Sequence, residues 1–312
     1  MLDPDKIKNV RIAACDLNGQ MRGKILPKFE EKKFNDGSIR MPFSALNVDV
    51  FGADIENSPL VFETGDQDGL LKSTHRGAIP IPWLKNPTAL VPMSMFMETG
   101  MPFEGDPRYA LERVLKDYET KGLKVLAATE MEFYLIDESK NSILPPINPI
   151  SKKRLSTPDV LGISELNCFE DFFAELQDSC EQVGINLQSI ISESGCGQFE
   201  VTLKHCEALK ASDDAWLFKS LAKGLARKHG MAATFMAKPY LQDAGNGMHI
   251  HFSILNLYGD NIFDNKTNEG SEVLRWAVAG CLKGLRGSTL IFAPFENSYK
   301  RFVKNAHAPT SA

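Results

Sequence analysis

Three short apolar segments carry polar residues at every second position, and these residues are of the kinds that bind metals. The alternating residues are Glu130, Glu132 and Tyr134 in residues 128–136, Gln198, Glu200 and Thr202 in residues 198–203, and His249, His251 and Ser253 in residues 248–254. Because successive side chains of a β-strand point to opposite faces, each segment predicts a strand with one apolar and one chemical face.

The three polar faces gather acids and imidazoles and contain almost no lysine. A solvated sheet face is the plainer interpretation of any one of these strands. If the faces line one cavity, however, neighbouring carboxylates repel each other unless a cation lies between them. Oxygen-rich ligand sets favour hard divalent ions such as Mg²⁺ or Mn²⁺, and an imidazole is compatible with Mn²⁺. Together the strands predict a divalent-metal site.

A further acid, Glu193, precedes Glu200 by a stretch that contains Ser-Gly-Cys-Gly. Two glycines there allow a sharp turn or a close approach to a ligand. A simple hairpin loop is the alternative interpretation.

Local signals predict the elements that hold these residues. A strand is expected at Val10–Cys15, and four helices are expected at 107–118, 169–183, 212–229 and 271–285. Asp106 and Pro107 are an N-cap and first-turn pair, and Ser212 is the expected cap of the third helix. Prolines cluster before residue 103, which favours loops and edge strands there. The change from proline-rich loops and strands to a capped helix predicts a domain boundary near residue 105.

Length and composition restrict the class of protein. The chain has 312 residues, of which 43% are hydrophobic and 24% charged, the balance of a globular protein of about two domains. A net charge of −5 gives no attraction to nucleic acid, and no apolar run is long enough to cross a membrane. Six scattered cysteines and a charged N-terminal start favour reduced thiols and a cytoplasmic location.

Several ordered motifs resemble the glutamine synthetase family along essentially the whole chain. They are 16–24 (DLNGQMRGK), 105–108 (GDPR), 130–135 (EMEFYL), 193–200 (ESGCGQFE), 246–253 (NGMHIHFS) and 297–301 (NSYKR). No phosphate-binding loop of the form G-x4-G-K-[ST] is present. The resemblance implies that ATP is held by metals and sheet residues instead.

The resemblance also implies roles for the matching residues. One metal is expected on Glu132, Glu193 and Glu200, and a second, at the nucleotide phosphates, on Glu130 and His249. His251 is expected to contact the transferring phosphate, and Arg301 to offset its charge. Gly245, Asn246 and Gly247 are expected to line the glutamate pocket.

Two positions depart from the ammonia-using members of the family. His307 stands where those members have a glutamate that binds and deprotonates ammonium, and Ala244 stands where they have asparagine. Both changes resemble the branch that joins glutamate to larger amines, and a histidine can act as the base near neutral pH. An exposed loop residue is the alternative interpretation of His307.

The expected activity is therefore ATP-dependent ligation of L-glutamate to an organic amine or polyamine through a γ-glutamyl phosphate. The alternatives are an ammonia-using glutamine synthetase and a catalytically inactive relative that acts by binding or assembly. The resemblance implies an α+β fold, with a β-grasp-like domain at 1–105 and a catalytic domain with a curved antiparallel sheet at 106–312. It also implies a homo-oligomeric ring, and the family continues beyond the last residue, Ala312, with further residues for ATP, glutamate and the second metal.

Overall fold

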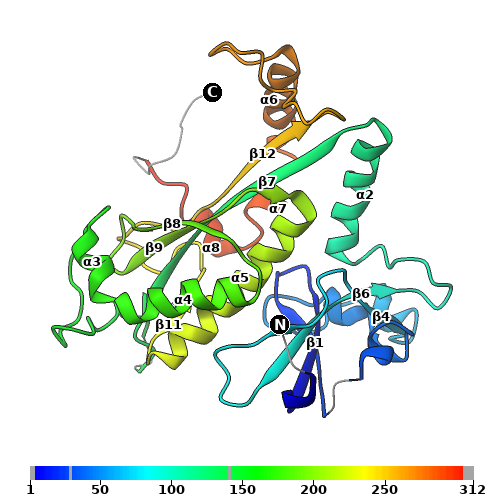
Figure 1. Cartoon of the computed structure of the whole chain (residues 1–312), viewed down its shortest axis with the longest axis horizontal. Coiled ribbons are helices and arrows are strands. Elements are labelled where there is room, and N and C mark those ends of the chain that lie inside the picture. The colour runs from blue at the N-terminus through cyan, green and yellow to red at the C-terminus, as the bar shows by residue number, and fades with distance from the viewer. Residues whose placement is uncertain (1–3, 28–29, 140–141, 305–312) are drawn as a thin grey trace. The chain divides into compact units, whose positions relative to one another are not determined.

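The computed structural model describes residues 4–27, 30–139 and 142–304, and the chain divides into two compact units (Figure 1). The first unit is Met1–Thr120 with Glu181–Gly184, and the second is Lys121–Cys180 with Ile185–Ala312. The units divide after helix α2 (Pro107–Thr120), whereas the sequence places a domain boundary before this helix. In the described part of the chain, no helix has the length and apolarity that crossing a bilayer requires.

A mixed sheet forms the first unit. Its strands are β1 (Asn9–Cys15), β2 (Met21–Leu26), β3 (Ile39–Pro42), β4 (Asp68–Ser73), β5 (Ile79–Pro80) and β6 (Thr88–Phe96). They run in the order β2-β1-β6-β4-β3, and β5 also pairs with β6. Strands β1 and β6 are parallel, and the other pairs are antiparallel.

The core of this unit lies under β1, the strand that the sequence predicts at Val10–Cys15. Val10, Ile12 and Ala14 are buried on one face and pack with Leu71 and Met95. Short helices complete the unit: three 3-10 turns at Pro4–Lys6, Glu31–Phe34 and Phe43–Leu46, and α1 (Pro59–Phe62).

Helix α2 begins where its cap signal predicts. The Asp106 carboxylate accepts a hydrogen bond from the Arg108 amide at 2.9 Å, and also one from the Met95 amide at 2.9 Å. Asp106 is 1% exposed, so one buried side chain both caps the helix and holds it to β6.

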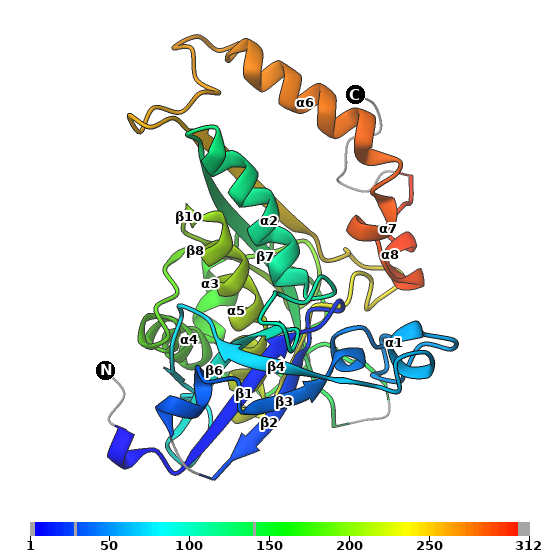
Figure 2. The same ribbon diagram turned by 90° about the vertical axis from the view of Figure 1, so that its right-hand side faces the viewer.

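An antiparallel sheet around β7 (Lys124–Ile136) forms the second unit. The other strands are β8 (Leu187–Ser192), β9 (Gln198–Leu203), β10 (Cys206–Glu207), β11 (Ala232–Thr234) and β12 (Met248–Leu255). Each of β9, β10, β11 and β12 pairs with β7, and β8 pairs with β9. Strands β7, β8 and β10 of this sheet are labelled in Figure 2. The α+β fold class expected from the sequence is confirmed. The three strands predicted to carry the metal-binding residues, β7, β9 and β12, all lie in this sheet.

Helices cover one face of this sheet. They are α3 (Ile163–Cys168), α4 (Glu170–Gln182) and α5 (Ala208–Lys228). Three further helices follow β12 along the chain: α6 (Glu272–Leu285), α7 (Thr289–Phe292) and α8 (Glu296–Tyr299). The predicted start of the third long helix at Ser212 is wrong, because the helix begins at Ala208. Ala208 and Ala211 are both buried, so their packing extends the helix toward its N-terminus beyond the predicted cap at Ser212.

A cluster of aromatic rings fixes which face of the sheet is buried. Phe133 of β7 lies 6.4 Å from Phe199 of β9 and 6.3 Å from Phe218 of α5, measured between ring centroids. Phe173 of α4 lies 4.9 Å from Phe199. Because side chains alternate, this buried face turns Glu130, Glu132 and Glu200 to the other face.

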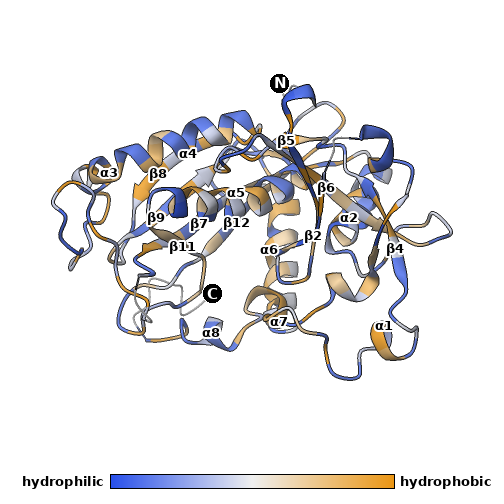
Figure 3. Cartoon of the chain, turned by 90° about the horizontal axis from the view of Figure 1, so that it is seen from below, coloured by the Kyte–Doolittle hydropathy of each residue, from blue (hydrophilic) through white to orange (hydrophobic). Residues whose placement is uncertain are grey.

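Strand β12 departs from the expected pattern. Met248, Ile250 and Phe252 occupy its apolar face but are 50%, 57% and 47% exposed, and only Ile254 is buried. Helix α6 also has no buried residue, although Figure 3 colours much of α6 and α7 hydrophobic. The Phe252 ring lies 5.9 Å from that of Phe263, but the three side chains stay about half exposed, so alternation along β12 predicts the strand but not its burial.

Candidate metal centre and active site

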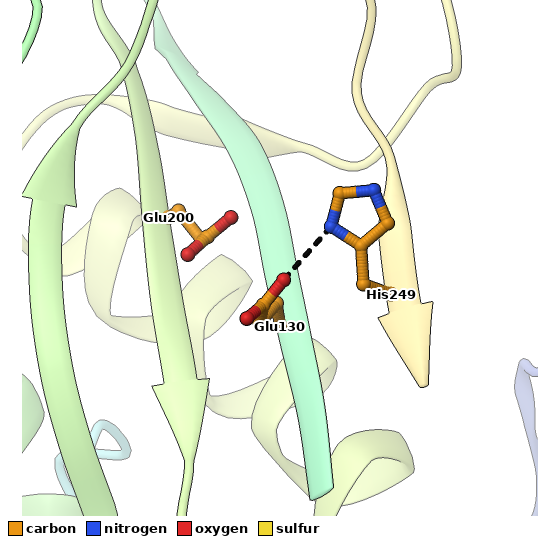
Figure 4. Close-up of side chains that lie close together, drawn as sticks. All are labelled: Glu130, Glu200 and His249. Carbon is orange, nitrogen blue, oxygen red and sulfur yellow. Dashed lines mark hydrogen bonds and ion pairs between the residues drawn. The ribbon is translucent and has the colours of Figure 1, made fainter. Parts of the chain in front are cut away.

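Glu130, Glu200 and His249 form a cluster on the open face of the second sheet (Figure 4). Each offers one ligand atom, and these three atoms lie within 4.8 Å of one another. The strand register produces the cluster, because Glu130 of β7 pairs with His249 of β12 on one side and with Thr202 of β9 on the other. Three strands that are far apart in sequence thus present their side chains to one point.

The Glu130 carboxylate lies between two imidazoles. Its Oε2 atom is 2.8 Å from His249 Nδ1, and its Oε1 atom is 2.9 Å from His251 Nε2. Burial works to raise the pKa of Glu130, but the hydrogen bonds to the two histidines outweigh it and leave the pKa below its ordinary value. Both imidazoles are exposed, so they can turn toward a ligand.

The ionised form of the Glu200 carboxylate is disfavoured in the folded chain. Burial raises its pKa to about 7, and the nearby carboxylates of Glu130, Glu132 and Glu193 add to the shift. A divalent cation among these groups would offset the repulsion and favour the ionised form. Carboxylate oxygens with one imidazole nitrogen are a ligand set suited to Mg²⁺ or Mn²⁺, so the residues present fit such an ion.

Glu132 is anchored by a backbone amide and a buried side-chain amide. Its Oε2 atom accepts hydrogen bonds from the Gly247 amide at 2.8 Å and from Gln198 Nε2 at 3.3 Å. Burial raises the pKa of Glu132, and the Gly247 hydrogen bond opposes that rise. Glu132 faces Glu200 directly across the β7–β9 pairing.

Arg301 lies beside the same glycine segment. A Cβ atom added to Gly247 would lie 2.9 Å from Glu132 Oε1 and 3.3 Å from Arg301 Nη2, and one added to Gly245 would lie 2.8 Å from Arg301 Cγ. Only glycine leaves room for the backbone to approach both side chains. The structure therefore brings Arg301, Glu132 and the predicted glutamate-pocket glycines together.

Glu193 occupies the tight turn before β9. Its amide donates to the Gln198 carbonyl at 2.8 Å, and its carboxylate accepts from the Ser194 amide at 2.8 Å. The turn depends on Gly197, which has a φ of +78°. Glu193 and Glu132 act on Glu200 electrostatically but lie outside the cluster of Glu130, Glu200 and His249, so their assignment to a metal stays a prediction.

Asn246, the third expected pocket residue, is 5% exposed. Its Nδ2 atom donates to the carbonyls of Met236 at 2.9 Å and Thr234 at 3.3 Å. The side chain of Asn246 thus holds the segment in place, and its role toward a substrate stays a prediction. His307, the expected base, lies outside the described residues.

Two residues near the site, Gln198 and Asp243, make contacts that the sequence pattern does not predict. Gln198 was placed on the polar face of its strand, and its contacts with Glu132 and Asn246 give it a further role. Asp243 joins two loops, because its carboxylate accepts from the Cys196 and Ala244 amides, each at 2.9 Å. No local pattern in the sequence marks Asp243.

Comparison with known proteins identifies the family. A family model described as "Glutamine synthetase, catalytic domain" matches residues 104–312. The chain belongs to the glutamine synthetase family. The match begins next to the domain boundary near residue 105 that the sequence predicts.

Relatives of several named activities are similar to this chain. It is 34% identical over 97% of its length to gamma-glutamylputrescine synthetase PuuA of Escherichia coli K12. It is 33% identical over 96% to glutamate–isopropylamine ligase of Pseudomonas sp, and 33% identical over 97% to glutamine synthetase of Pyrococcus horikoshii. The chain spans 65%, 66% and 63% of the lengths of these three relatives.

Solved structures agree with the fold. The chain superposes on one described as "Apo GmaS without ligand" with a TM-score of 0.80 at 28% identity, covering 95% of this chain and 66% of that one. A second, described as "GmaS/ADP complex-Conformation 1", also gives a TM-score of 0.80 at 28% identity and covers 99% and 68%.

Proposed function

We propose that this chain carries the metal and glutamate sites of an ATP-dependent ligase that joins the γ-carboxylate of L-glutamate to an organic amine. The observation that carries the proposal is the convergence of Glu130, Glu200 and His249 on one face of a sheet in a glutamine synthetase catalytic domain. Two of the relatives most similar in sequence are named for putrescine and isopropylamine, which supports an organic amine as acceptor.

The proposed reaction has two steps. A glutamate γ-carboxylate oxygen attacks the γ-phosphorus of ATP and ADP leaves, which gives γ-glutamyl phosphate. The amine nitrogen then attacks the acyl carbon, phosphate leaves, and a base takes the amine proton. Divalent cations held by Glu130, Glu132, Glu193, Glu200 and His249 would supply charge neutralisation for the phosphates.

The chain's own residues have distinct tasks in this proposal. The Arg301 guanidinium, beside Gly245 and Gly247, offsets negative charge on the transferring phosphoryl group. His251 contacts the same group from β12, and His307 takes the proton of the attacking amine. The Gly245–Gly247 segment orients the glutamate, so most of the catalytic effect comes from positioning and electrostatics.

A second candidate function is synthesis of glutamine from ammonia. It is favoured by the 33% identity to the Pyrococcus horikoshii glutamine synthetase, which equals the identity to the isopropylamine ligase. The two functions differ only in the acceptor, so an amine panel separates them.

The test is amine-dependent release of phosphate from ATP and glutamate, with Mg²⁺ or Mn²⁺, across ammonia, methylamine, ethanolamine and putrescine. We expect turnover with an organic amine that exceeds turnover with ammonia, and no release when glutamate is omitted. Turnover with ammonia alone would establish the second candidate. Folded chain that binds metal but turns over no amine would contradict a ligase activity of this chain and favour a binding or assembly role.

A further inference from the structure

Gln198, the first residue of β9, is a buried amide at the centre of the candidate site. It is 1% exposed. Its Nε2 atom lies 2.9 Å from Asn246 Oδ1, 3.1 Å from the Gly245 carbonyl oxygen and 3.3 Å from Glu132 Oε2. Its Oε1 atom accepts from the Gly195 amide at 2.9 Å. Every polar atom of this side chain therefore has a partner.

These partners fix the orientation of the amide. Three acceptors surround the nitrogen, and a backbone donor faces the oxygen. A flipped amide would place its oxygen against three acceptors and its NH₂ group against an N–H. The NH₂ group has two protons for three acceptors, so one proton is shared, and the longest contact is the one to Glu132.

The contacts join three segments that are distant in the sequence. Glu132 lies on β7, Gly195 on the turn that carries Glu193, and Gly245 on the segment before β12. Glu132 and Gly245 are separated from Gln198 by 66 and 47 residues. The Glu132 carboxylate, the turn before β9 and the glycine segment thus share one buried anchor.

The geometry around Glu132 shows what this anchor does. Both of its hydrogen bonds, from Gln198 and Gly247, fall on Oε2. Among the described residues, none donates a hydrogen bond to Oε1 of Glu132. Oε1 is the atom nearest to a Cβ added at Gly247. One carboxylate oxygen is held by protein donors, and the other has no hydrogen-bond donor among the described residues.

We propose that Gln198 is a positioning residue that aims Glu132 at a metal and holds the Gly245–Gly247 segment in its substrate-binding form. The role in substrate binding rests on the proposed function. Partners that orient a metal ligand commonly change metal affinity by about 10- to 100-fold when they are removed. Gln198 reaches a predicted ligand and a predicted substrate segment together, so its loss acts on both.

Two substitutions separate the contacts. Gln198→Glu keeps the shape and the acceptor for the Gly195 amide, but it puts a carboxylate against Glu132 and two further acceptors. Gln198→Asn keeps the amide and withdraws it by one methylene group. Gln188→Glu is the matched control, because Gln188 is an exposed glutamine on the neighbouring strand β8.

The experiment combines hydrogen exchange at the Gly247 amide with Mn²⁺ titration of the full chain. We expect both Gln198 variants to lose protection at Gly247 and to bind Mn²⁺ at least about tenfold more weakly, while Gln188→Glu behaves as wild type. If the chain turns over substrate, the KM of the Gln198 variants for glutamate should rise about tenfold and their kcat should change less. A lower folded fraction alone would reduce kcat at constant KM.

Hydrogen exchange separates this proposal from the proposed function. If wild-type chain binds no Mn²⁺ but the variants still lose protection at Gly247, the metal site fails and the positioning of Glu132 stands. A folded variant with wild-type protection at Gly247 and wild-type Mn²⁺ affinity would overturn the role of Gln198. Failure of both variants to fold would also overturn it, because Gln198 would then serve the fold rather than the site.

Discussion

Glu132 and Glu200 lie directly opposite each other in the antiparallel pairing of β7 and β9. Facing like charges destabilise a sheet, and here burial and three neighbouring carboxylates also raise the pKa of Glu200 to about 7. A fold that served only stability would not keep this pair. The relationship links the register of two strands to the proposed metal chemistry.

Replacing Glu200 by glutamine should therefore stabilise the metal-free chain. The folded pKa of Glu200 exceeds the ordinary value of 4.5, so its ionisation costs stability above pH 7 and nothing near pH 5. We expect Glu200→Gln to raise the free energy of unfolding by about 1–2 kcal/mol at pH 8. Denaturant unfolding at pH 8 and pH 5, without divalent ions, measures the difference. Equal or lower stability of the variant at pH 8 would contradict the repulsion.

Metal binding should release protons near neutral pH. Glu200 is about half protonated at pH 7 and must ionise to bind a cation. We expect the affinity for Mn²⁺ to rise as pH increases from 6 to 7.5 and then to level off. Calorimetric titration in buffers of different ionisation enthalpy measures the proton release directly. An affinity that does not change over this range would exclude Glu200 as a ligand.

Glu165 gives an independent prediction on stability, away from the metal ligands. It is 7% exposed, and burial raises its pKa to about 7, although the backbone amide of Asp159 donates to it at 3.1 Å and opposes the shift. The folded state binds this proton more tightly than the unfolded state, so stability falls as pH rises from about 4.5 to 7.

Glu165→Gln should remove that dependence. We expect the variant to be more stable than wild type by up to about 3 kcal/mol at pH 8 and little changed at pH 5. The exposed Glu181→Gln is the control, with no difference between the two pH values. If Glu165→Gln shifts unfolding equally at both pH values, the buried carboxylate does not titrate as described.

Two glycines predict opposite results for the same substitution. A Cβ atom at Gly195 would lie 1.7 Å from Tyr134 Oη, which donates to the Ala244 carbonyl at 2.7 Å. We expect Gly195→Ala to destabilise the second unit by about 2 kcal/mol or more. Gly280 lies within α6 with no atom near its added Cβ, so Gly280→Ala should stabilise by about 0.5–1 kcal/mol. Thermal unfolding of the two variants, beside wild type, measures both changes in stability.

Local signals in the sequence were enough to predict most elements of the site. Alternation placed Glu130, Glu132 and Glu200 on the chemical faces of β7 and β9, because a strand's period is independent of its neighbours. The helix expected at 271–285 is confirmed as α6, and the Ser271 hydroxyl accepts a hydrogen bond from the Leu274 amide at its start. The resemblance to glutamine synthetases, not the pattern alone, assigned roles to these residues.

Features that depend on distant contacts were not predicted. The start of α5 at Ala208 follows from packing, and the contact of Gln198 with Glu132 joins positions 66 residues apart. Asp243 joins Cys196 to Ala244 without any periodic signal. A one-dimensional pattern gives the face of a side chain, but the partner across the fold follows only from register and packing.

The most direct test of the account is calorimetric titration of the full chain with Mn²⁺ at pH 8, beside Glu200→Gln, His249→Gln and the control Glu181→Gln. We expect saturable binding to wild type and to Glu181→Gln, and at least about tenfold weaker binding to the other two variants. Binding that is absent from folded wild type, or unchanged in Glu200→Gln and His249→Gln, would contradict a metal centre on β7, β9 and β12.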